Sequence, residues 1–85
     1  MPMTMDWPKG KGVAINLKGA GGFAIVHSTH EAAVFLTSCW PLRGPAFARA
    51  LELICDAFAG EADDEAARLA FVAAADEADV SVQLH

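Results

Sequence analysis

Residues 13–27 read VAINLKGAGGFAIVH, and this stretch decides the fold. Apolar side chains alternate with small or polar ones over residues 13–17, and a second alternating run covers residues 23–27. Alternation of this kind is typical of a strand with one buried face. The intervening residues 19–22, GAGG, can adopt the positive φ angles that a tight turn requires. We therefore expect residues 13–27 to form an antiparallel hairpin.

A helix is expected directly after this hairpin. Residues 28–31, STHE, form a capping box, in which a serine hydroxyl accepts a hydrogen bond from the N–H three residues on and a glutamate reaches back. The helix should end near Cys39, because Pro41 disfavours helical conformation at the residue before it.

Two further helices are expected in the second half of the chain. Pro45 suits the first turn of one, and Gly60 is a natural stop for it. Acidic residues at 63–65 would lie at the positive end of the other, which should therefore start near residue 63. The apolar stripe of the second helix comprises Phe47, Ala50, Leu51, Ile54, Cys55 and Phe58. The stripe of the third comprises Ala67, Ala70, Phe71, Ala74, Ala75 and Ala78.

The last element is expected to be a short strand, because Val80, Val82 and Leu84 alternate with polar residues. The predicted fold is a small single α+β domain over residues 13–85 with the order β-β-α-α-α-β. In it the hairpin and the C-terminal strand pack against the helices. Residues 1–12 contain prolines and glycines without periodicity and are predicted to form a flexible N-terminal arm.

Length and composition limit the classes of function. The 85 residues suffice for one domain, yet 54% of them are hydrophobic and 20% are charged, so some apolar surface is expected to remain for a partner. The net charge is −5, and Arg68 is the only basic residue between residues 52 and 85 before the terminal histidine. A nucleic-acid-binding protein normally carries a basic stripe, so we expect no nucleic-acid partner.

The compartment is inferred from the cysteines and from the apolar runs. Cys39 and Cys55 lie in apolar helical patterns without a CxxC pair, so both are predicted to be free core thiols of a reducing compartment. No secretory signal pattern begins the sequence, and no apolar run approaches the roughly 20 residues that span a bilayer. The expected location is the cytoplasm, without a membrane partner.

A set of residues in the helical part resembles a known family. These residues are Trp40-Pro41-x-x-Gly44, Ala50, Cys55, Gly60 and Ala67-Arg68-x-x-Phe71-x-x-Ala74-Ala75-x-Glu77-Ala78. The pattern resembles the domain of unknown function 982, found in short bacterial proteins of rhizobia and their relatives, and the likeness runs from about residue 24 to residue 80. The resemblance implies a small cytoplasmic protein without an established activity.

No constellation of catalytic, cofactor-binding or metal-binding residues is recognised. His27, His30 and Cys39 are close in sequence, but zinc needs four ligands, or three and a water, in compatible geometry. The glycines at 19–22 lead from strand to strand, whereas a phosphate-binding loop leads into a helix. The acidic pair at 76–77 is interpreted as a solvated helix end. We expect no enzyme activity and no cofactor.

Five residues are candidates for contact with a partner: Trp40, Arg43, Arg68, Leu69 and Val72. Tryptophan and arginine often anchor interfaces. Trp40 could equally be structural at a helix corner, and Arg68 could form an ion pair with Asp64 one turn away. Leu69 and Val72 lie opposite the alanine stripe of the third helix, which predicts either a homodimer contact or burial of this helix on all sides within the monomer.

The function class that these patterns favour is a non-catalytic protein-interaction or self-associating accessory module. Its partners would be a second copy of the chain, as a homodimer, and a further protein of unknown identity. The alternative is a small-molecule or effector-binding domain, which would need a deep pocket with convergent polar groups.

Overall fold

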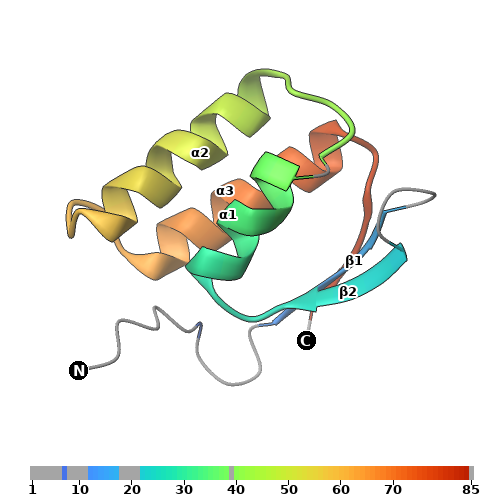
Figure 1. Cartoon of the computed structure of the whole chain (residues 1–85), viewed down its shortest axis with the longest axis horizontal. Helices are drawn as coiled ribbons and strands as arrows, with labels where there is room; N and C mark the ends of the chain where they lie inside the picture. Colours follow the sequence, from blue (N-terminus) through green and yellow to red (C-terminus); the bar gives the residue numbers. More distant parts are fainter. Residues whose placement is uncertain (1–6, 8–11, 18–21, 39, 85) are drawn as a thin grey trace.

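The computed structural model describes residues 7, 12–17, 22–38 and 40–84, and these form three helices and a small sheet (Figure 1). The prediction of a small α+β domain is confirmed. The elements are β1 (Val13–Leu17), β2 (Gly22–Val26), α1 (Thr29–Ser38), α2 (Pro45–Phe58), α3 (Asp64–Glu77) and β3 (Ser81–Leu84).

The sheet is antiparallel, with β1 between β2 and β3. Val13 pairs with Val26 in β2 and with Leu84 in β3. The expected hairpin of β1 and β2 is therefore confirmed, while the turn residues 18–21 lie outside the described residues. Figure 1 shows the three helices on one side of the sheet.

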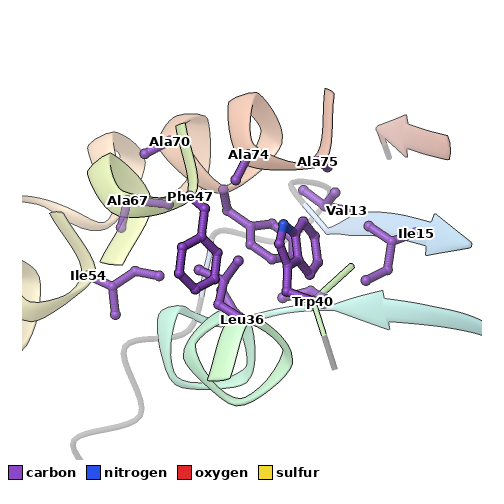
Figure 2. Close-up of a cluster of buried hydrophobic side chains, with 14 of the residues drawn as sticks. Val13, Ile15, Leu36, Trp40, Phe47, Ile54, Ala67, Ala70, Ala74 and Ala75 are labelled. Atoms are coloured by element: carbon purple, nitrogen blue, oxygen red, sulfur yellow. The ribbon is translucent and has the colours of Figure 1, made fainter. Parts of the chain in front are cut away.

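The core lies between the sheet and the helices and is centred on Phe71 of α3. Phe71 is fully buried, and its ring centroid lies 5.3 Å from that of Trp40. Val13 and Ile15 of β1 are also fully buried and close the core on the sheet side. Figure 2 shows Trp40 in one cluster with Leu36 of α1, Phe47 of α2 and the small side chains of α3. The α3 alanines buried in this cluster are Ala67, Ala70, Ala74 and Ala75.

The N-terminus of α1 is capped much as the sequence predicts. The Ser28 hydroxyl accepts a hydrogen bond from the Glu31 N–H at 3.1 Å, which confirms the serine half of the capping box. The glutamate half differs by one residue, because Glu31 Oε1 accepts from the N–H of His27 at 2.7 Å. The cap therefore ties the end of β2 to the first turn of α1.

We expect Ser28→Ala to lower the free energy of unfolding by about 1 kcal/mol, because the Glu31 N–H would lose its acceptor. Urea denaturation followed by circular dichroism measures the change. Ser38→Ala, at an exposed position at the other end of α1, is the control and should change stability little. An unchanged unfolding midpoint for Ser28→Ala would show that the cap contributes nothing.

The segment predicted to be a flexible arm contains a buried tryptophan. Trp7 is only 5% exposed, and its ring centroid lies 6.2 Å from that of Phe71. Its backbone N–H donates to the carbonyl of His27 at 2.8 Å. The arm prediction is thus wrong at Trp7, because one indole can be anchored without any periodic pattern around it. Residues 1–6 and 8–11 lie outside the described residues, so for them flexibility stays a prediction.

The prediction that both cysteines are core thiols is wrong for Cys55, which is exposed. The buried line of α2 runs through Phe47, Ala50, Ile54 and Ala57. Cys55 follows Ile54 by one residue, about 100° around the helix, and so lies beside this line. Cys39 lies outside the described residues.

Candidate interaction surface

Helix α3 presents one large apolar side chain to solvent. Leu69 is 55% exposed, whereas Phe71 on the opposite side of the helix is fully buried. Val72 is partly buried and packs against the core. Of the two residues predicted to project from the side opposite the alanine stripe, Leu69 is therefore exposed and Val72 is only partly exposed. Burial of α3 on all sides within the monomer is excluded at Leu69.

The surroundings of Leu69 on α3 are small or acidic. Ala66 and Ala73 lie three residues before and four residues after it, so they share its face of the helix. Glu65 and Asp76 are exposed and lie one turn before and two turns after Leu69. Leu69 is thus an exposed apolar side chain between two alanines, with acidic residues farther along the same face of the helix.

Other large apolar side chains are also exposed, but they are distributed over different elements. Among the described residues they are Ile25 of β2, Val34 of α1, Leu42 before α2 and Phe58 of α2. Each is between 40% and 47% exposed, which is less than Leu69. Scattered exposed apolar residues are normal for a soluble domain, so Leu69 with its alanine surroundings is the stronger candidate.

Arg68 is buried rather than available at the surface. Only 6% of the residue is exposed, and its guanidinium bonds the Glu65 carboxylate at 3.1 Å and 3.3 Å. The local ion pair considered as the alternative role of Arg68 is thus present, but with Glu65 instead of Asp64, whose Oδ1 accepts a hydrogen bond from the Thr29 hydroxyl at 2.9 Å. A buried guanidinium needs a charged partner, and the two-bond geometry to Glu65 supplies one.

Trp40 and Arg43 both lie in the connection between α1 and α2, but their side chains differ in exposure. Trp40 is 6% exposed and contacts Phe71, so it belongs to the core, which agrees with its alternative structural interpretation. Its indole N–H has no hydrogen-bond partner among the described residues. Arg43 is exposed, and its guanidinium carbon lies 5.7 Å from the ring centroid of Phe47, in a cation–π arrangement.

Two hydrogen bonds that share the buried Thr29 hydroxyl connect three segments that are far apart in the sequence. The Trp7 indole N–H donates to Thr29 Oγ1 at 3.0 Å, and the Thr29 hydroxyl donates in turn to Asp64. Thr29 is fully buried, so its hydroxyl would carry a desolvation penalty without these partners. Sequence analysis missed these two hydrogen bonds, because residues 7, 29 and 64 share no short-range pattern.

The N-terminus of α2 is capped by a side chain from α3. No side chain of the N-cap residue Gly44 is available, and instead Glu77 accepts from the N–H of Ala46 at 3.0 Å and from that of Phe47 at 3.2 Å. The interpretation of this glutamate as a solvated helix end is therefore wrong. A Cβ at Gly44 would lie only 2.6 Å to 2.8 Å from the Glu77 carboxylate, so glycine leaves the space that the carboxylate occupies.

This arrangement predicts strong coupling between Gly44 and Glu77. We expect Glu77→Ala to lower the free energy of unfolding by about 1–2 kcal/mol, because two N–H groups at the positive end of a helix lose a carboxylate. Gly44→Ala should have a smaller effect of the same sign, because the added Cβ displaces the carboxylate at the end of a flexible side chain. In a Glu77→Ala background the Gly44→Ala change should be nearly neutral, because Gly44 has a φ of −94° that alanine adopts readily.

Denaturant unfolding of the wild type, the two single variants and the double variant measures this coupling. Additive effects of the two substitutions would contradict the steric account of Gly44.

Of the three candidate metal ligands, Cys39 lies outside the described residues. His27 and His30 are both exposed. Among residues 7, 12–17, 22–38 and 40–84, no group of three or more histidine, cysteine or acidic side chains could hold a metal ion. In the same part of the chain, no helix has both the length and the apolar character needed to cross a membrane.

Comparison with known protein families gives one match. A family model described as a protein of unknown function, DUF982, matches residues 11–82. Neither the curated proteins nor the solved structures gave a match. The matched range contains β1, β2, the three helices and the first half of β3, but not Trp7, which lies four residues before its start.

Proposed function

The chain belongs to the DUF982 family, and we propose that it is a non-catalytic, cytoplasmic protein-interaction module that associates with itself as a homodimer. The observation that carries the proposal is the exposure of Leu69 on a helix whose other side forms the core. Of the five candidate contact residues, Leu69 is the centre of the proposed contact and Val72 lies at its edge. Trp40 and Arg68 are not part of it, because both are buried.

The energetic argument concerns removal of Leu69 from water. Full burial of an exposed leucine side chain is worth roughly 1.5–3 kcal/mol, and Leu69, which is 55% exposed, would gain part of this at the contact. The alanines around Leu69 leave room for a second helix to approach closely. Two copies related by a twofold axis would each contribute this face, so the contact is formed twice. The pairing of Glu65 with Arg68 reduces the repulsion that two acidic faces would otherwise suffer.

Leu69→Glu tests the proposal. Because Leu69 is 55% exposed, we expect the variant to keep its helical circular dichroism signal and to lose the dimer in light scattering, with an unfolding midpoint lowered only by the stabilisation that the dimer contributes. Val34→Glu, which places the same charge on an exposed apolar site of α1, is the matched control and should remain dimeric. A Leu69→Glu protein that stays dimeric, or two variants that dissociate equally, would refute Leu69 as the contact.

A further inference from the structure

The domain forms a slot for an indole that comes from outside the family-matched range. Trp7 precedes residues 11–82, yet 95% of it is buried against the domain, since only 5% is exposed. The slot is formed by the ring of Phe71, the Thr29 hydroxyl and the carbonyl of His27. The residues that receive Trp7 all lie within the matched range, so the domain supplies the site and the N-terminal arm supplies the occupant.

The contacts in this slot are specific for tryptophan. Because the Thr29 hydroxyl donates its proton to Asp64, its oxygen remains free to accept from an indole N–H. A phenylalanine would fill the space beside Phe71 but would leave this buried oxygen without its donor. The bond from the Trp7 backbone N–H to the His27 carbonyl additionally fixes the main chain that carries the indole.

We propose that this slot is a recognition site for a tryptophan-bearing segment, and that the arm of a second copy of the chain can occupy it in trans. Every contact described above is made by residue 7 itself, and a second copy carries the same residue. Exchange of arms would therefore preserve each hydrogen bond and the ring contact. This site is separate from the Leu69 surface, so either proposal can fail while the other stands.

The arm of the same chain competes for the slot, because a short tether gives an effective concentration of the order of millimolar. Binding in trans is therefore measured with a full-length Trp7→Ala, Trp40→Phe variant, which contains no tryptophan because the chain has two. The probe is a synthetic peptide of residues 1–12, whose indole is then the only one in solution.

We expect the indole emission of the peptide to shift to the blue and to saturate as the variant is added. The peptide should also raise the melting temperature of the variant, because a ligand that binds only the folded state stabilises it. If the variant is partly unfolded, the peptide should restore its helical circular dichroism signal. Addition of Thr29→Val to the variant should weaken peptide binding about threefold to tenfold, since one hydrogen bond to the indole is lost.

Absence of both the emission shift and any stabilisation would overturn the proposal. Equal binding of the peptide to the Thr29→Val protein would also overturn it, because the slot would then bind the ring without recognising the indole N–H. At micromolar protein concentrations the arm of the same chain outcompetes the arm of a second copy, so the mass of the wild type and of Leu69→Glu in light scattering reports on the Leu69 contact and not on arm exchange.

Discussion

Phe71→Ala is expected to lower the free energy of unfolding by about 3–5 kcal/mol, the usual effect of removing a buried phenylalanine ring. Phe71 is fully buried and lies against the rings of both Trp7 and Trp40, so the cavity would open at the centre of the core. A domain of this length has a total stability of roughly 4–13 kcal/mol. The variant should therefore be largely unfolded if the wild-type stability is near the lower limit.

Urea denaturation followed by circular dichroism measures this effect. Phe58→Ala is the matched control, because Phe58 is 47% exposed at the end of α2 and should cost less than about 1 kcal/mol. Similar unfolding midpoints for the two variants would contradict the placement of Phe71 at the centre of the core.

Trp7→Ala is expected to be nearly as damaging, with a loss of about 3–5 kcal/mol, although residue 7 lies outside the family-matched range. The substitution removes a buried ring from Phe71 and deprives the Thr29 oxygen of its donor. Trp7→Phe is the informative comparison, because it keeps a ring in the slot and loses the indole N–H. We expect it to cost about 1–2 kcal/mol.

Thermal melts of the wild type and of both variants provide the measurement. A melting temperature of Trp7→Ala equal to that of the wild type would show that the domain does not depend on the N-terminal indole. Equal losses for Trp7→Phe and Trp7→Ala would instead show that the hydrogen bond to Thr29 carries the whole effect.

Local patterns were sufficient to predict the α+β class, the hairpin and the start of α1. The alternation of apolar residues over 13–17 follows from the two faces of a single strand. The Ser28 cap involves the N–H of a residue only three positions away. The stripe of α3 was predicted by the same logic, and its alanines are buried with the exception of Ala78, which is partly buried.

The features that escaped prediction are contacts between distant residues. Glu77 caps α2 across 30 and 31 positions, and Thr29 bonds Asp64 across 35 positions. The spacing of residues within one helix or strand cannot predict contacts between two different elements. For the candidate contact residues, the sequence identified suitable residue types, but burial separates Leu69 from Trp40 and Arg68.

The misplacement of Cys55 has a similar origin. An i, i+3, i+4 pattern allows two neighbouring lines on a helix, and only the packing of α2 on α3 selects the line through Ile54 and Ala57.

The molar mass of the wild-type protein in solution, determined by light scattering over a range of concentrations, tests the central claim most directly. The account predicts a concentration-dependent approach to twice the 8.9 kDa of one chain, and a return to 8.9 kDa for Leu69→Glu at the same concentrations. A wild-type protein that keeps the mass of a single chain up to high micromolar concentration would contradict self-association through Leu69.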